Sequence, residues 1–391
     1  METLRIAIIT ETLPPAQLNL QPWRYLGRLA RSLQQEGHEA FALTTEEGLP
    51  SWNGVPVVRH PERGDFRTAR GLRRLMENHN ANGGVVRMTA SLFFSMRQPT
   101  PPADSRGSLI GVFLRPLHRG TDLARRFLDP DLAPEILLDM HHAGLYASRK
   151  LGTWREASRY VDEFVFLWES DRTSAVWAGL AAGSSHVVRH PFDPSFRDRT
   201  PTPLGERLSL VLPPGSQRVV FTGPPEPTRG VGDVVRLARV LPPDRPTQVL
   251  LLLRDGTVPG LAATRHRIGV HEVLQIRGLV TKDELRAIYQ RSQAAVFPYR
   301  FVRTGLPLVL LEAVAAGLPV VTTRVHPIRE LEGRTGLAFA RPRDPADIAG
   351  AIRGALEDGR RQDLGRKNEA WMRETPDWPS IAKTYVSFVK R

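Results

Sequence analysis

The sequence contains no cysteine among its 391 residues. This absence excludes disulfide bonds, a thiolate nucleophile and cysteine-based zinc sites. Long apolar runs are also missing, because no stretch approaches the ~18 consecutive apolar residues of a membrane-spanning helix. The first residues, METLRIAIITETLPP, show no basic segment followed by an apolar one, so we expect no signal peptide. Together these absences predict a cytoplasmic protein.

Acidic residues are too few to balance the basic ones. The chain has 41 Asp and Glu against 54 Lys and Arg, a formal net charge of +13. Such a charge favours an anionic partner, whether nucleic acid, acidic lipid or a phosphorylated small molecule, but says nothing about the fold. The densest basic runs, RTARGLRR from Arg67 and LRPLHRGTDLARRF from Leu114, also fit a solvated basic face. No nucleic-acid-binding motif accompanies them, so we expect no specific nucleic-acid partner.

The length exceeds that of a single compact core and indicates two domains. LRIAIIT (4–10) is an apolar run typical of a buried parallel strand. WRYLGRLARSLQQEGH then places apolar residues at helical spacing up to Gly37, and EAFALTT follows as a strand. This order is the unit of a doubly wound α/β fold. EILLDMHH, EFVFLWES and SHVVRHP predict further strands, whereas 78–129 is interpreted as an irregular insertion.

A segment rich in proline and polar residues, 193–216, has the composition of a linker. After it the alternation begins again, with strands expected at RVVFTG, QVLLLL, HEVLQIRG and AAVFPY. TKDELRAIYQRS predicts a helix that begins after an N-cap threonine. The fold class is therefore α/β, with two doubly wound domains in tandem.

The segment TGLPLVLLEAVAAGLPVVTT predicts a helix just past the carboxyl end of a parallel strand, where ligands bind in such sheets. With Thr304 as N-cap, backbone N–H groups from Gly305 onward would be free for a diphosphate. Glu312 lies about two turns into this helix, on a face near Leu308 and Leu311. A carboxylate on an apolar helix needs a partner. A ribose diol and an arginine at a domain surface explain it equally well on spacing alone.

Several segments, taken in order, carry a resemblance to a known family. They are IAIITETLPP, HPFDPSF, IRGLVTKDELRAIYQRSQAAVFPY, the Gly305 and Pro307 region with LLEAVAAGLPVVTT, and TPDWPSIAKTYVSFVK. They resemble the retaining GT-B glycosyltransferases of family GT4. The resemblance implies two Rossmann-like domains facing across a cleft: residues 1–200 bind the acceptor and 201–378 the nucleotide sugar, while a helix over 379–391 packs back on the first domain.

The activity implied is that of a hexosyltransferase, which moves a sugar from a nucleotide-diphosphate sugar to an acceptor hydroxyl with retention. No metal and no cofactor other than the donor substrate are expected. Asp129–Asp131, in the sequence DPD, is interpreted as a turn because Leu and Pro flank it in a loop-like segment. The acceptor is left open among saccharides, lipid-linked molecules and small molecules.

The resemblance also assigns roles to particular residues. Glu312 matches the acid that binds the ribose, and Arg229 matches one of two cations on the donor diphosphate. Gly305 and Leu306 would offer backbone N–H groups to the same diphosphate. Thr304 stands where the family has the acid that contacts the donor sugar, and Pro224 stands in place of the second cation.

We predict that Arg300 or Arg303 replaces that second cation, because both precede the expected phosphate helix. Two adjacent residues, His141 and His142, are candidates for the catalytic histidine of the family. Their side chains would point to opposite faces of a strand, so one would face the cleft, and His142 is preferred.

The departures from the family pattern support an alternative, a catalytically lapsed GT-B scaffold that acts as a binding or partner protein. Three departures are noted: Thr304, Pro224 and the segment PPAQLNLQPW, which stands where the family has a glycine pair. A dinucleotide oxidoreductase is disfavoured because no G-x-G-x-x-G follows the first strand. A sugar-nucleotide epimerase shares the fold but usually carries other motifs.

The segment 78–129 is expected to shape the acceptor site. Its basic and apolar stretches, ASLFFSMR and LIGVFLRPLHR, predict peripheral contact with an anionic membrane, at the inner membrane surface.

Overall fold

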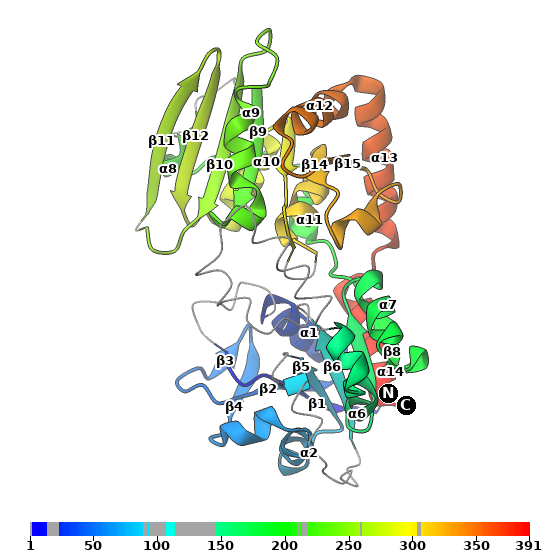
Figure 1. Ribbon diagram of the computed structural model, residues 1–391. Coiled ribbons are helices and arrows are strands. Elements are labelled where there is room, and N and C mark those ends of the chain that lie inside the picture. The colour runs from blue at the N-terminus through cyan, green and yellow to red at the C-terminus, as the bar shows by residue number, and fades with distance from the viewer. Residues whose placement is uncertain are drawn as a thin grey trace.

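A computed structural model describes residues 2–13, 23–88, 92–93, 107–113, 145–209, 212, 217–258, 260–302 and 306–391. Two mainly parallel sheets are each flanked by helices and lie one above the other (Figure 1). The first has the order β3-β4-β2-β1-β5-β6-β7-β8 and the second β11-β12-β10-β9-β13-β14-β15. None of the described helices is both long and apolar enough to cross a membrane.

The first sheet comprises the following strands: β1 (Arg5–Ile9), β2 (Glu39–Thr44), β3 (Ser51–Trp52), β4 (Val55–Arg59), β5 (Gly83–Arg87), β6 (Ser108–Phe113), β7 (Glu163–Phe166) and β8 (Ser185–Val187). Only the β3–β4 pairing is antiparallel among its described ladders. The accompanying helices are α1 (Trp23–Gln35), α2 (Ala69–Asn78), α6 (Thr153–Ala157) and α7 (Glu169–Trp177), with short 3-10 segments η2 (Arg63–Arg67), η3 (Ala182–Ser184) and η4 (Pro194–Phe196).

The second sheet comprises β9 (Gln217–Gly223), β10 (Thr247–Arg254), β11 (Leu261–Ile268), β12 (His271–Gly278), β13 (Ala294–Phe297), β14 (Val320–Thr323) and β15 (Leu337–Ala340). Its helices are α8 (Glu206–Ser209), α9 (Val231–Leu237), α10 (Lys282–Gln290), α11 (Leu308–Ala315), α12 (Pro345–Leu356) and α13 (Asp358–Glu374), with 3-10 segments η5 (Pro227–Arg229) and η6 (Ile328–Leu331). The last helix of the chain, α14 (Trp378–Val389), lies on the first domain.

The predicted strands and helix starts are confirmed where the residues of the element itself show an apolar run or a capping motif. Strand β1 is almost wholly buried, as its apolar run predicts. Thr281 is the N-cap of α10 and forms a capping box with Glu284, each side chain bonding the other residue's backbone N–H. β7, β8, β9, β10, β12 and β13 fall in the segments expected to be strands. β11 was not expected; it is an exposed antiparallel edge strand without alternating burial.

The interpretation of 78–129 as an irregular insertion is wrong for its described part. β5 and β6 lie inside this segment and are inner strands of the first sheet. Glycines concealed β5: a Cβ on Gly83 would lie 2.5 Å from Cγ2 of Val389, and one on Gly84 2.7 Å from Sδ of Met76. A larger residue at either position would have to displace these side chains, so glycine fits the sheet where the sequence pattern favours a loop.

The apolar residues that were expected to contact a membrane belong to the inner strand β6. Leu109, Ile110, Val112 and Phe113 of LIGVFLRPLHR are all buried in β6. They cannot also face a membrane. The basic residues that follow them, and all but two residues of ASLFFSMR, lie outside the described residues.

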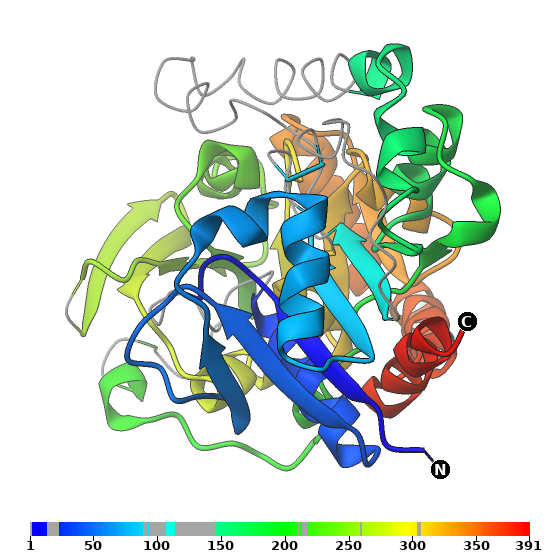
Figure 2. The same ribbon diagram turned by 90° about the horizontal axis from the view of Figure 1, so that it is seen from below.

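Helix α14 returns the chain to the first domain. It packs on α1, where the hydroxyls of Tyr25 and Tyr385 lie 3.3 Å apart and the rings of Tyr25 and Trp378 meet edge to face. Figure 2 shows α14, in red, beside the first sheet, with both chain ends on the same side of the molecule. The segment around η4 and the α13–α14 junction thus both cross between the domains.

A carboxylate of the second domain caps a helix of the first. Glu330, in η6, accepts hydrogen bonds from the backbone N–H groups of Glu169 (3.4 Å) and Ser170 (3.1 Å), at the start of α7. Asp171 lies beside this contact, and its Oδ1 is buried without a hydrogen-bond partner among the described residues. Burial and the nearby charge of Glu330 raise the pKa of Asp171 to about 7.

Candidate functional site

A cavity of about 410 Å³ lies between the two domains, at the carboxyl ends of β9, β10 and β12. This is the edge at which open α/β sheets bind ligands. Its lining comes from both domains: Arg24, Arg28, Phe196, Thr222, Leu252, Arg254, Ile276, Gly278, Leu279, Val280, Thr281, Lys282, Leu285 and Glu312. Four of these side chains are cationic and one is acidic, so the cavity carries excess positive charge.

Glu312 is the acid of this cavity. It lies in the second turn of α11, and its side chain is only 6% exposed. Arg24, which α1 of the first domain supplies, donates a hydrogen bond from Nη1 to Oε1 of Glu312 at 3.0 Å. Of the two partners that the sequence left open, the structure therefore contains an arginine at a domain surface. Glu312 also lines the cavity, so a ligand in the cavity can still reach it although it is paired with Arg24.

The Arg24–Glu312 pair belongs to a network that joins the domains. Nη2 of Arg24 donates to Oδ2 of Asp193 at 3.2 Å, and Nζ of Lys282 lies 2.7 Å from the same oxygen. Burial opposes the ionisation of Asp193. The hydrogen bonds from Lys282 and Ser195 outweigh it and lower the pKa of Asp193 below its ordinary value. Asp193 is thus an anion that holds two cations at the rim of the cavity.

Helix α11 begins later than the sequence indicates. Its N-cap is Pro307 and its first residue is Leu308, so the prediction of Thr304 as N-cap is wrong. A proline fits this position because helix starts tolerate its fixed backbone. Thr304, Gly305 and the neighbouring Arg303 lie outside the described residues. The side chain of Leu306 is buried, and the part of its backbone in diphosphate binding stays a prediction.

Arg229 ends η5 and is not among the residues that line the cavity. Its side chain is 19% exposed, with Nε 4.0 Å from Glu226 and the guanidinium carbon 5.3 Å from the ring centre of Tyr299. Burial raises the pKa of Tyr299 to about 12 although Arg229 opposes the rise. Gly230 follows with φ +73°, and a Cβ there would overlap the Pro298 carbonyl oxygen. Glycine at this position is what lets η5 approach the end of β13.

Arg300 is engaged elsewhere. Its Nε and Nη2 donate to the two carboxylate oxygens of Asp233, both at 2.9 Å, and the two side chains are almost fully buried. Arg300 is also absent from the cavity lining. The hypothesis that it replaces the missing diphosphate cation therefore needs correction: its fork is committed to a buried carboxylate.

His141 and His142 lie outside the described residues, as does Asp129–Asp131. Within the described ranges, His60, Glu62 and Asp65 bring possible metal ligands within 4.8 Å of one another. Asp65, however, already accepts from His60 (3.0 Å) and Arg74 (3.2 Å). We assign no metal to this group.

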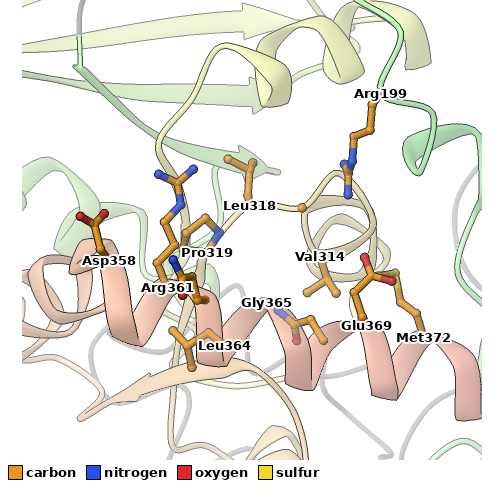
Figure 3. A pocket seen from close by; sticks show the side chains of 13 residues that line it. Arg199, Val314, Leu318, Pro319, Asp358, Arg361, Leu364, Gly365, Glu369 and Met372 are labelled. Carbon is orange, nitrogen blue, oxygen red and sulfur yellow. The ribbon is translucent and has the colours of Figure 1, made fainter.

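A second cavity, of about 460 Å³, lies between α11, α13 and the crossing segment near Arg199 (Figure 3). Two of its lining side chains are cationic, Arg199 and Arg361, and two are acidic, Asp358 and Glu369. Its lining is therefore balanced in charge, whereas the cavity at Glu312 is not. We accordingly place the candidate site at Glu312.

Sequence reasoning missed Arg24, Arg28, Asp193, Arg254 and Lys282. A weak signal existed for two of them, because Arg24 and Arg28 are four residues apart and share one face of α1, whose other positions are mostly apolar. Asp193 lies in the HPFDPSF segment, although nothing local marks it as a partner of Arg24. The contacts that define the site join residues far apart in the chain.

Two Rossmann-like domains with a cleft at the carboxyl ends of their strands define a GT-B protein, and comparison with solved structures agrees. An Anabaena protein, HepE, in complex with UDP superposes with a TM-score of 0.65, over 99% of this chain and 100% of that one, at 14% sequence identity. Residues 216–358 match the family model of the Glycosyl transferases group 1. The carboxy-terminal domain thus belongs to the group 1 glycosyl transferases, in a chain with the GT-B fold.

Curated relatives agree with this family. A glycogen synthase of Mycobacterium tuberculosis is 32% identical over 174 residues, which are 43% of this chain and 41% of that protein. The match spans less than half the length of that relative. An uncharacterized glycosyltransferase of Methanocaldococcus jannaschii is 23% identical over 99% of this chain and 98% of its own length.

Proposed function

We propose that the protein is a retaining glycosyltransferase of family GT4, which transfers a sugar from a nucleotide-diphosphate sugar to an acceptor hydroxyl. The observation that carries the proposal is the cavity between the domains. It combines one nearly buried acid, Glu312, with four cationic side chains at the carboxyl ends of the strands. Its volume lies within the range of about 300–1,000 Å³ typical of small-molecule sites.

A nucleoside diphosphate supplies the groups that this lining needs. The two hydroxyls of a ribose can donate to the carboxylate of Glu312, in the place that Arg24 now takes. The diphosphate brings the negative charge that matches the surplus cations. The Anabaena neighbour, which shares the fold, is a complex with UDP, so UDP is the first nucleotide to test.

The mechanism follows from the leaving group. A nucleoside diphosphate departs more readily when cations meet the charge that develops on it, which is electrostatic catalysis. The acceptor hydroxyl would attack from the face that the diphosphate leaves, with a phosphate oxygen taking its proton. No pair of carboxylates of the hydrolase kind is required. His142 or His141, Thr304 and Arg229 keep the roles that the family resemblance implies, as part of this proposal.

The alternative is a lapsed scaffold that binds a partner without transfer. Two observations favour it: Pro224 stands where a diphosphate cation is expected, and Glu312 is held by Arg24. A transferase must bind a nucleotide sugar at Glu312 and transfer its sugar, whereas a lapsed scaffold lacks at least one of these two steps.

Thermal stability in the presence of nucleotides tests the first step, donor binding. Wild type, Glu312→Ala and a control, Glu332→Ala, are heated with UDP, GDP, ADP and dTDP and with their sugars. Glu332 is an exposed acid of the same domain, paired with Arg324 away from the cavity. A ligand at 100 times its Kd stabilises the native state by about 2.7 kcal/mol. We expect one base to raise the Tm of wild type and control but not of Glu312→Ala.

The same nucleotide sugar then serves in a transfer assay. Retention of the anomeric configuration, read by NMR, and activity in EDTA are the expected results. If no nucleotide stabilises wild type, donor binding is refuted and the scaffold becomes the better explanation. Binding without transfer to any saccharide, lipid-linked or small-molecule acceptor would also favour the scaffold.

A further inference from the structure

Arg254 occupies a position that the sequence did not single out. It is the last residue of β10, whose seven preceding residues are all buried, and it is the first with an exposed side chain. Leu253 pairs with Gly223 of the neighbouring strand β9, so the next residue on each strand, Arg254 and Pro224, emerges at the same edge. On its other side Arg254 pairs with Gly278 of β12. The edge that lacks a cation at Pro224 therefore has one on the adjacent strand.

The surroundings of Arg254 leave its charge unneutralised. It lines the same cavity as Glu312 and Arg24. Across the described ranges, no carboxylate is within ion-pair distance of it, and Glu312 is already bonded to Arg24. The side chain of Arg254 keeps accessible surface, but the cavity removes part of its hydration. This desolvation lowers the pKa of Arg254, although the negative charge of Glu312 opposes the change. Arg24 and Arg229 add repulsion.

An anion that enters the cavity would relieve this repulsion. Arginine suits a phosphate because its planar fork can donate two parallel hydrogen bonds. Arg300 cannot take this part, because Asp233 holds its guanidinium. Arg254 is the cation at the carboxyl end of a central strand that faces the cavity.

We propose that Arg254 contacts the diphosphate of the nucleotide donor and supplies, from β10, the positive charge that Pro224 cannot supply from β9. The inference rests on the proposed function and deepens it by assigning the donor charge to a residue of this chain. In this inference Arg254 binds the diphosphate of the donor and contacts neither the base nor the ribose.

Binding measurements with a graded set of ligands test this assignment. The ligands are the diphosphate among UDP, GDP, ADP and dTDP that stabilises wild type most, the matching nucleoside, and inorganic pyrophosphate. The variants are Arg254→Gln, Arg254→Lys and a control, Arg277→Gln. Arg277 lies on β12 beside Leu253, bonds Asp255 at 2.8 Å and does not line the cavity. The Tm of each unliganded variant shows that it is folded.

We expect Arg254→Gln to weaken binding of the nucleoside diphosphate and of pyrophosphate by about ten- to a hundredfold, the range for hydrogen bonds to charged groups. Nucleoside affinity should be unchanged. Arg254→Lys should recover part of the loss, and Arg277→Gln should match wild type.

Unchanged diphosphate affinity in Arg254→Gln would overturn the inference alone, since wild type still binds. A loss of equal size for nucleoside and diphosphate would also overturn it, because Arg254 would then contact the nucleoside. If wild type binds none of the four diphosphates, the proposed function and the inference fail together.

Discussion

The pair of Arg24 and Glu312 should contribute measurably to stability because it joins the domains and one partner is nearly buried. Replacing Arg24 by methionine keeps much of the side-chain length but leaves the carboxylate of Glu312, only 6% exposed, without its hydrogen-bonded cation. Removing one partner of a fully buried pair costs about 3–5 kcal/mol. Arg24 is 22% exposed and the charge of Arg254 still acts on Glu312, so we expect about 2 kcal/mol.

The reverse change should cost less. Glu312→Gln removes the charge but keeps the shape, and Arg24 retains Asp193 as a partner. We expect a loss of about 1 kcal/mol, typical of one hydrogen bond. If the two residues act as a pair, Arg24→Met with Glu312→Gln should lose less than the sum of the single losses, by about 1 kcal/mol.

Thermal unfolding measures these differences. For domains of this size about 1 kcal/mol corresponds to about 2–4 °C, so Arg24→Met should lower the Tm by about 4–8 °C. The comparison uses apparent Tm values, because unfolding of two domains need not be a single transition. Lys383→Met, which breaks the pair of the exposed Lys383 with the partly buried Glu36, is the control and should change the Tm little. Additive losses in the double variant would refute the pairing as a source of stability.

Two further predictions concern the backbone and pH. Because the folded-state pKa of Asp171 is raised from 3.8 to about 7, stability is lost as pH rises through this window. Asp171→Asn should therefore gain on wild type by up to about 2–3 kcal/mol between pH 5 and pH 8. Tm curves of variant and wild type that stay parallel over this range would contradict it. Gly230→Ala should lower the Tm because its Cβ would overlap the Pro298 carbonyl oxygen at positive φ, at a cost of about 1–3 kcal/mol or more, whereas Gly232→Ala, which meets nothing within 4 Å, should be neutral or stabilising. Equal effects of the two glycine changes on Tm would show that η5 does not need its close approach to β13.

Much of this fold is readable from the sequence because neighbouring residues carry the signal. Apolar runs mark β1 and β10, and Thr281 with Glu284 marks the start of α10. The lone acid on the apolar helix α11 likewise indicates a site, since a buried carboxylate must find a partner whatever the fold. The predicted start of α11 is wrong, because the sequence alone does not distinguish Thr304 from Pro307 as the N-cap of this helix.

Tertiary structure alone decided how the site is assembled. Arg24 and Glu312 are 288 positions apart, and only the stacking of two domains brings them to 3.0 Å. Arg254 stands beside Pro224 because β10 pairs with β9, a register that parallel strands set through long-range hydrogen bonds. β5 cannot be read from the sequence, because Gly83 resembles a loop residue and only the approach of Val389, from the other end of the chain, shows why glycine fits there. Periodicity and capping are properties of a few adjacent residues, whereas packing and charge complementarity arise between residues that only the folded chain brings together.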